Sequence, residues 1–167
     1  MTPSDTLKSI NDYGLSEAEF AVVGRIIIEF ASIERNADIT LDLYGKETPR
    51  NLSDRVRDVG KVIRAVGDDH AQKLSQEFAW AMNETAEARN LLAHGLLLYP
   101  EDGPVELWSE KLDRHMTLPQ VLMCLPYAHY ANYCLQYLIW HRLDIMPPKP
   151  FPDRPAYAET ERQNTTP

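Results

Sequence analysis

Residues 71–95 read AQKLSQEFAWAMNETAEARNLLAHG, and this stretch decides the fold that the sequence predicts. Apolar and small side chains recur in it at steps of three and four residues, which is the spacing of one face of an α-helix. Asp68 is a favourable N-cap before it, and Gly95 is a favourable stop after it. The stretch therefore predicts one long helix with a single stripe, formed by Ala71, Leu74, Phe78, Met82, Thr85, Arg89 and Leu92.

Three further segments have the same helical periodicity. The first runs from about Ser16 to Tyr44 and begins with a capping-box pattern, in which Glu19 follows Ser16 by three positions. The second runs from about Leu52 to Val66, and the third runs from about Thr117 to Leu143. The third segment is apolar on more than one side, which favours a central position or a subunit contact.

The remaining segments complete an all-α fold: a compact bundle of four main helices with a small insertion. Residues 96–99 and 105–108 flank a Pro-Glu-Asp-Gly turn, so we expect a β-hairpin or irregular loop near residues 96–108. Residues 147–167 begin Pro-Pro-Lys-Pro-Phe-Pro, a composition that cannot continue a helix. The sequence thus predicts one helical domain over residues 1–146 and a loose, Pro-rich polar tail over residues 147–167.

The bulk composition suits a single domain in a reducing compartment. The chain has 167 residues, of which 44% are hydrophobic, and only two cysteines. Cys124 and Cys134 lie ten positions apart on one predicted helix, about 15 Å at the usual rise, which is too far for a disulfide within that helix. We see no secretory leader and no apolar run of membrane-spanning length. A cytoplasmic protein without membrane contact is therefore expected.

The charge distribution argues against a protein that coats nucleic acid through a broad basic face, because the net charge is −8. Basic residues are nevertheless concentrated between residues 50 and 64, where five of them meet two acids. Arg57, Lys61 and Arg64 in this segment are the best candidates for contacts with a phosphate backbone. The alternative is a solvated helix face on which Arg and Asp side chains pair with one another.

Arg89 is the unusual member of the stripe on the 71–95 helix. A helical projection places it in line with Phe78 and Met82, and a charge in such a position needs a partner. The same projection places Glu34 within the stripe of the first helix, whereas Glu29 falls toward an edge. We therefore predict a Glu34–Arg89 ion pair between the two helices. A structural salt bridge without any catalytic role is an equally good interpretation of that pair.

Asn90 and His94 follow Arg89 and stand four residues apart, so both side chains lie on one helical face. A histidine at a helix C-terminus has its cationic form favoured by the helix dipole, and imidazole exchanges protons near neutral pH. Arg89, Asn90 and His94 therefore bring three polar groups together around the last helical turns. The competing interpretation is an ordinary helix stop, since Arg, His and Gly are common there.

The Arg89-Asn90-x-x-x-His94 pattern at the end of a long helix, followed by Gly95 and preceded by an acidic helix, resembles the signature of the HEPN superfamily. The resemblance covers roughly residues 16–143. It implies a compact helical protein, and many members of the superfamily are metal-independent ribonucleases that work as homodimers. A toxin or phage-defence ribonuclease, with RNA as substrate and an antitoxin or defence protein as a further partner, is what the resemblance suggests.

In RNA cleavage of this kind, the 2′-hydroxyl attacks the neighbouring phosphate while a base removes its proton and an acid protonates the leaving oxygen. The resemblance assigns His94 as general acid or base and Arg89 as phosphate clamp. Asn90 would orient these groups, and Glu34 would hold Arg89. Because each chain has one such His, a two-fold dimer would supply the second. No cofactor is implied, and the other histidines and the cysteines show no metal-ligand spacing.

Two other functions fit the same residues. A noncatalytic HEPN module would bind a nucleotide, RNA or a protein partner without turnover. A purely structural helical protein would use Arg89 and His94 only for ion pairing and for ending the helix.

Overall fold

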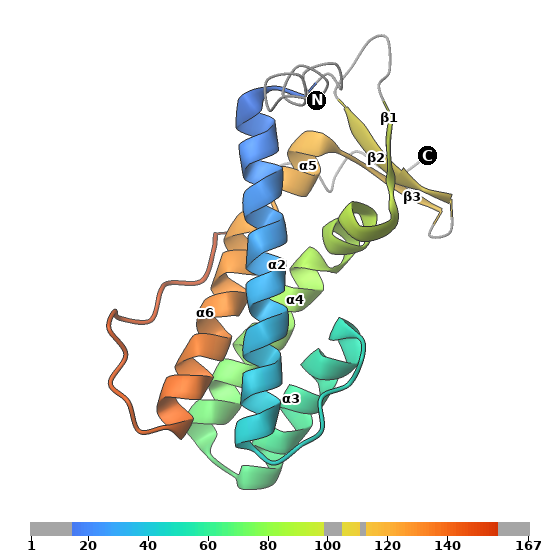
Figure 1. Ribbon diagram of the computed structural model, residues 1–167. Coiled ribbons are helices and arrows are strands. Elements are labelled where there is room, and N and C mark those ends of the chain that lie inside the picture. The colour runs from blue at the N-terminus through green and yellow to red at the C-terminus, as the bar shows by residue number, and fades with distance from the viewer. Residues whose placement is uncertain (1–14, 99–104, 111–112, 157–167) are drawn as a thin grey trace, which may run out of the picture.

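The structure is a computed structural model that describes residues 15–98, 105–110 and 113–156. Its four main helices form a bundle with a small antiparallel sheet at one end (Figure 1). The predicted mainly helical bundle is therefore confirmed. The helices are α2 (Glu17–Leu43), α3 (Leu52–Val66), α4 (Asp69–His94), α5 (Leu118–Leu122) and α6 (Leu125–Arg142), and the strands are β1 (Leu96–Leu98), β2 (Glu106–Ser109) and β3 (Arg114–Thr117).

Local capping interactions begin the long helices where the sequence predicts them. The Ser16 hydroxyl accepts from the Glu19 N–H, and the Glu19 carboxylate accepts from the Ser16 N–H at 2.8 Å, which completes the capping box of α2. Asp68 caps α4 by accepting from the Ala71 N–H at 2.9 Å. Gly67, with φ at 75°, adopts the left-handed conformation that ends α3.

The core lies between α2, α4 and α6, with α3 packed against α2 and α4 on the other side. In Figure 1, α3 accompanies only one end of the bundle, and the sheet and α5 lie at the opposite end. The buried apolar residues of α2 recur at helical spacing, at Ile26, Phe30, Ile33, Ala37 and Leu41. The largest fully buried side chains include Ile26, Ile33, Leu41, Ile63, Phe78, Leu91, Leu118, Leu135 and Leu138.

The sheet continues directly from α4 and confirms the predicted hairpin. Strand β2 lies at its centre, paired with β1 through Leu97 opposite Leu107 and with β3 through Trp108 opposite His115. Gly95 joins α4 to β1 at a point of very close backbone approach. A Cβ at this position would lie 2.4 Å from the Leu91 carbonyl oxygen and 3.1 Å from that of Trp108. The short contacts therefore require glycine here. The backbone conformation does not require it, since a φ of −83° is ordinary for any residue.

Two elements differ from the prediction. The single fourth helix expected over residues 117–143 is divided into α5 and α6 by a turn at Met123 and Cys124. Pro126 explains the break, because it has no N–H to donate to the Leu122 carbonyl and its ring would collide with that oxygen. Strand β3 was not predicted, since its sequence, Arg-His-Met-Thr, has no alternation of apolar side chains.

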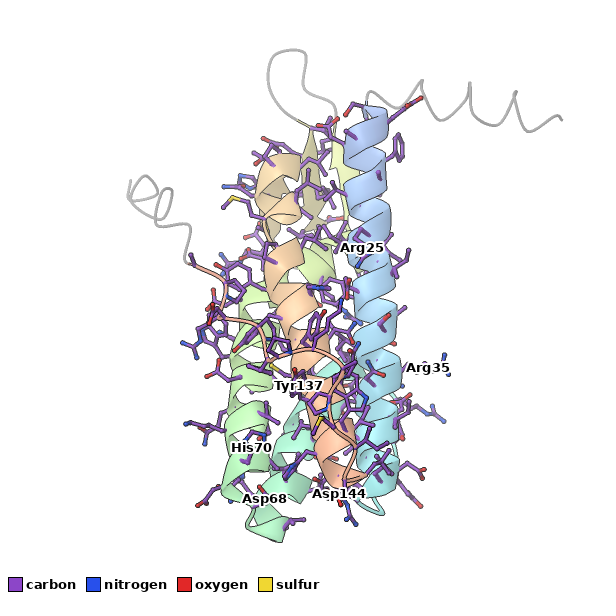
Figure 2. The ribbon with its side chains drawn as sticks, turned by 90° about the vertical axis from the view of Figure 1, so that its left-hand side faces the viewer. Arg25, Arg35, Asp68, His70, Tyr137 and Asp144 are labelled. Carbon is purple, nitrogen blue, oxygen red and sulfur yellow. The ribbon has the colours of Figure 1, made fainter. Side chains whose placement is uncertain are left out.

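The segment after α6 packs back on the bundle over the part that the structure describes (Figure 2). The Tyr137 hydroxyl donates to the Lys149 carbonyl, and Arg154 forms an ion pair with Glu77 at 2.9 Å. Phe151 lies against the Tyr130 and Tyr137 rings. Residues 147–156 are thus attached to the domain rather than loose, while the rest of the expected tail, residues 157–167, lies outside the described residues.

None of the helices in the described ranges is long and apolar enough to cross a membrane. Both cysteines carry free thiols and are buried on the α6 side of the core. Burial raises the pKa of Cys124 to about 12, and burial raises the pKa of Cys134 still further above its ordinary value. Neither thiol is therefore suited to act as a nucleophile near neutral pH.

Candidate functional site

Glu34 connects three helices at the middle of the bundle. Its Oε1 lies 3.6 Å from Arg89 Nη2 on α4, and its Oε2 accepts from Arg55 Nη1 on α3 at 3.2 Å. Arg55 is fixed further by Asp38, 3.0 Å from its Nε, and by the Pro49 carbonyl. The structure therefore contains the predicted Glu34–Arg89 contact, with Arg55 as an additional partner that sequence reasoning did not include.

The ion pair is more open than the helical projection predicts. The side chains of Arg89 and Glu34 retain 29% and 40% of their exposure, so neither is a core group. Near its C-terminal end α4 also packs against β2 and β3, and the buried positions there are Ala88 and Leu91. This change of neighbours turns Arg89 toward the side of the bundle. A half-exposed guanidinium can contact an external phosphate, which a buried one cannot.

Asn90 completes the immediate surroundings of Arg89. Arg89 Nη1 donates to Asn90 Oδ1 at 3.2 Å. A guanidinium has five N–H donors, so these contacts with Glu34 and Asn90 leave donors directed elsewhere. Glu34 and Asn90 therefore orient Arg89 without occupying all of its hydrogen-bond donors.

Arg89 and Asn90 form one wall of a groove between α3 and α4, with a volume of about 210 Å³. Leu52 and Ser53, the first two residues of α3, form part of the opposite wall. At this N-terminus the Asn51 side chain accepts from the Asp54 N–H at 2.8 Å. The N–H groups of Leu52 and Ser53, which have no hydrogen-bond partner among the described residues, and the partial positive charge of the helix end favour an anion. The groove thus places a guanidinium opposite a helix N-terminus, in a volume that suits a phosphate group better than a whole nucleotide.

His94 lies at the C-terminal end of α4, four residues beyond Asn90, and is exposed. It does not belong to the lining of the groove. Within the part of the chain that the structure describes, its imidazole has no hydrogen-bond partner. The structure therefore brings Arg89, Asn90 and Glu34 together, with His94 outside that cluster on the same helix.

Two of the three basic side chains of α3 that the sequence analysis named, Arg57 and Lys61, pair with acids of their own helix. Arg57 contacts Asp54 at 2.6 Å, and Lys61 contacts Asp58 at 3.2 Å. The hydrogen bond from Lys61 is the main reason that the pKa of Asp58 is lowered. Arg64 is exposed near the other end of α3. None of the three lines the groove beside Arg89. Arg57 and Lys61 form the kind of ion pairs with Asp that the alternative interpretation of this helix face expects.

A second polar cluster, between α2 and α6, was missed by sequence reasoning. Glu29 is only 3% exposed, and its carboxylate accepts from Arg25 at 3.0 Å and from Asn132 at 2.9 Å. His129 Nδ1 lies 3.0 Å from the same carboxylate, and Asn36 donates to Asn132 at 2.7 Å. Burial by itself would raise the pKa of Glu29, but the hydrogen bonds and nearby charges outweigh it and lower the pKa.

The sequence contained a signal for this cluster. Arg25 and Glu29 are spaced i,i+4, and His129 and Asn132 are spaced i,i+3, so each pair shares a helical face. The helical projection put Glu29 at an edge and Glu34 inside, whereas the structure buries Glu29 and exposes Glu34. Glu29 with His129 is a carboxylate–imidazole pair, in which the buried carboxylate fixes the orientation of the ring.

Among the described residues, no group of three or more His, Cys, Asp or Glu side chains is placed to hold a metal ion. No protein-family model matches the chain, and searches of curated proteins and of solved structures find no match to it either. The fold and the site together define a helical-bundle protein with an arginine-bearing groove and an exposed histidine at the end of the same helix.

Proposed function

We propose that this protein is a HEPN-like, metal-independent endoribonuclease that acts on cytoplasmic RNA as a homodimer. The observation that carries the proposal is the Arg89 guanidinium, held between Glu34 and Asn90 and facing a groove that ends at the N-terminus of α3. The biological setting, a toxin or phage-defence enzyme with an antitoxin or defence partner, comes from the family resemblance alone.

Arg89 acts in this proposal as the phosphate clamp and stabilises charge on the transition state. Glu34 and Asn90 position it, because each contacts a different terminal nitrogen of the guanidinium. A phosphate in the groove would meet Arg89 on one side and the first N–H groups of α3 on the other. Such prearranged donors stabilise developing negative charge at no cost in reorganisation.

His94 acts as the general acid or base. It takes the proton of the attacking 2′-hydroxyl or gives a proton to the leaving 5′-oxygen, so that the products carry a 2′,3′-cyclic phosphate and a free 5′-hydroxyl. The reaction uses both an acid and a base, whereas one chain supplies a single His94. A two-fold axis near this end of α4 would bring a second His94, and a second Arg89, to the same phosphate.

The surface beside His94 supports a subunit contact at this end. Strand β1 follows His94 in the chain, and its residues Leu96 and Leu98 keep 62% and 42% of their exposure. Because they are two positions apart, their side chains point to the same side of the strand. Strand β1 is also an edge strand of the sheet. An exposed edge strand with apolar side chains is a liability for a monomer and a natural place for a second copy to pack.

The proposal is tested by incubating end-labelled RNA with wild-type protein and with His94→Ala and His70→Ala variants, all in excess chelator. His70 is a matched control, because it is exposed at the opposite end of α4 and does not line the Arg89 groove. We expect wild type and His70→Ala to cut and His94→Ala not to cut. Cleavage by His94→Ala at the wild-type rate would refute the assigned mechanism.

A noncatalytic binding module is the second candidate, and the position of His94 outside the groove lining favours it. The groove would then bind a phosphate of RNA or of a nucleotide through Arg89 and α3 without turnover. This function predicts salt-sensitive RNA binding that Arg89→Ala weakens, with no cleavage by the wild type. Changes at Arg57 or Lys61 should then matter less than the change at Arg89, because these side chains are paired with acids.

A further inference from the structure

A second and larger cavity lies on the other side of α4, away from the proposed ribonuclease groove. Its volume is about 890 Å³, and it is enclosed by α4, α6 and residues 144–154. Figure 2 shows the chain after α6 turning back across α6 toward α4, with His70, Tyr137 and Asp144 in this region. The volume falls within the range of small-molecule sites in proteins, about 300–1,000 Å³.

The returning segment is fixed by several independent contacts, so it forms a wall of a preformed cavity. Arg154 binds Glu77 through two nitrogens at 2.9 Å each. The same guanidinium lies over the Trp80 ring, 3.9 Å from its centroid. Phe151 packs edge-to-face with Tyr137, at 5.0 Å between ring centroids.

The interior of the cavity is mainly apolar and aromatic. Leu74, Tyr137, Trp140, Ile145 and Phe151 belong to its lining. The hydroxyl of Tyr137 is already bonded to the Lys149 carbonyl, and that of the neighbouring Tyr130 donates to Glu77 at 3.0 Å. The two tyrosines therefore offer ring surface, rather than free hydroxyls, to a ligand.

Lys73 is the cation of the lining that can pair with an acidic substituent on a ligand. Glu77 is occupied by Arg154 and by Tyr130, which leaves Asp144 as the remaining carboxylate. Lys73 is exposed on the α4 wall, close to His70, and makes no ion pair with any described carboxylate. The lining has two cations, Lys73 and Arg154, and two carboxylates, Glu77 and Asp144, so it lacks the acidic excess of the whole chain, which has 25 Asp and Glu against 17 Lys and Arg.

We propose that this cavity binds a small molecule that combines a ring system with one acidic group, a carboxylate, sulfonate or phosphate. The ring lies among Tyr137, Trp140 and Phe151, and the acidic group pairs with Lys73. This inference is independent of the proposed ribonuclease activity, because no residue of the cavity belongs to the Arg89 groove.

The test uses two probes that differ only in the acidic group: 8-anilinonaphthalene-1-sulfonate and its uncharged analogue N-phenyl-1-naphthylamine. Binding to the full chain is followed by probe fluorescence and by calorimetry. We expect saturable binding of one sulfonate probe per chain. Lys73→Met should weaken the sulfonate probe by about fivefold, the size of one partly exposed ion pair, and leave the uncharged analogue unchanged.

Lys46→Met is the matched control, because Lys46 is also exposed but lies in the turn after α2, outside the cavity. It should leave both affinities unchanged. Ile145→Trp tests the location, since Ile145 is 51% exposed and a larger side chain there would occupy the cavity without disturbing the core. It should weaken both probes at least tenfold while the circular dichroism spectrum stays that of wild type.

Three outcomes would overturn the proposal. Absence of saturable binding by wild type rules out the site. Equal loss of the two probes in Lys73→Met rules out recognition of the acidic group. Wild-type binding by a folded Ile145→Trp variant places the probe elsewhere, with the exposed leucines of β1 as the obvious alternative.

Discussion

The Glu34 carboxylate is shared between Arg55 and Arg89, so the position of each of the three side chains depends on the other two. Arg55 is also tied to Asp38 and Pro49, which makes it the fixed member of the group. Arg89 has the looser contact, 3.6 Å from Glu34, and faces the groove. The arrangement fits a guanidinium that must be oriented in the free protein and still exchange contacts with a phosphate.

Substitution of Arg89 tests this role. Arg89→Lys keeps a positive charge but loses the planar fork that can contact two oxygens at once, so we expect cleavage to fall about 10²-fold or more. Glu34→Gln should reduce cleavage by about tenfold, because Arg89 keeps Asn90 as a partner. Single-turnover rates at saturating RNA are the measurement. Unchanged rates in Arg89→Lys would show that Arg89 has only a structural role.

Gly95 gives a prediction about stability that does not depend on function. Gly95→Ala would force its Cβ against the Leu91 carbonyl, and we expect a loss of about 2–3 kcal/mol in the free energy of unfolding. Gly60→Ala is the control, because nothing lies within 4 Å of a Cβ at this position inside α3. Alanine there should stabilise the protein by about 0.5–1 kcal/mol. Urea denaturation measures both, and equal effects would contradict the close approach at Gly95.

At the scale of the elements, helices with strong local signals are predicted well from sequence. α3 has the predicted bounds, and α2 and α4 begin at their predicted caps. The break between α5 and α6 was missed because the apolar pattern continues through it, although Pro126 requires it. Strand β3 was missed because its sequence lacks apolar alternation, although its partner β2 lies close to it in the chain. The packed segment 147–156 depends on partners far along the chain, such as Glu77, which local patterns do not reveal.

The same limit applies to the sites. The Arg89–Glu34 contact was predictable, because both residues stood out as charges on helical stripes. A projection at a constant angle, however, cannot follow a helix whose neighbours change along its length. It placed Glu34 inside and Glu29 at an edge, whereas Glu29 is buried and Glu34 is partly exposed. The cavity beside residues 144–154 could not be predicted from sequence, since its outer wall belongs to the expected tail.

The Glu29 cluster joins α2 to α6 and should make stability depend on pH. The pKa of Glu29 is lowered below its ordinary value of 4.5, so the folded state favours the ionised form. Its contribution is complete above about pH 4.5 and is lost as the pH falls through the lower folded value. We therefore expect Glu29→Gln to be less stable than wild type near neutral pH, with the difference shrinking below pH 4.5.

Urea denaturation of wild type and Glu29→Gln between pH 3 and 7 measures this dependence. Asn132→Leu is a companion variant, because it removes the hydrogen-bond donor to the buried Oε2 of Glu29 and should cost about 2 kcal/mol. A difference between wild type and Glu29→Gln that stays constant with pH would contradict the lowered pKa of Glu29.

At the scale of the whole molecule, α4 takes part in both proposed sites. Residues from Ala79 to Asn90 line the groove with α3, and residues from His70 to Glu77 line the cavity with α6. His94 and the exposed leucines of β1 lie at the end of α4 where the sheet begins. The bundle thus separates the proposed ligand cavity, the proposed phosphate groove and an apolar end along one helix.

The apolar end predicts how two copies associate. Leu96→Lys should convert the protein to a monomer, because a charge would have to be buried in the contact between copies. It should also abolish cleavage, since the proposed active site needs a second His94. Sedimentation velocity and the RNA assay measure the two effects. Ile27→Lys is the control, as Ile27 is 56% exposed on α2, and a dimer lost only in that variant would place the interface on α2 instead.

The central claim is that His94 transfers a proton in RNA cleavage, and the ratio of single-turnover rates for wild type and His94→Ala, in excess chelator, tests it most directly. A proton-transfer role predicts a fall of roughly 10²–10⁴-fold, with a 2′,3′-cyclic phosphate on the wild-type product and unchanged folding and association. Equal rates for the two proteins, or a wild-type product without the cyclic phosphate, would contradict it.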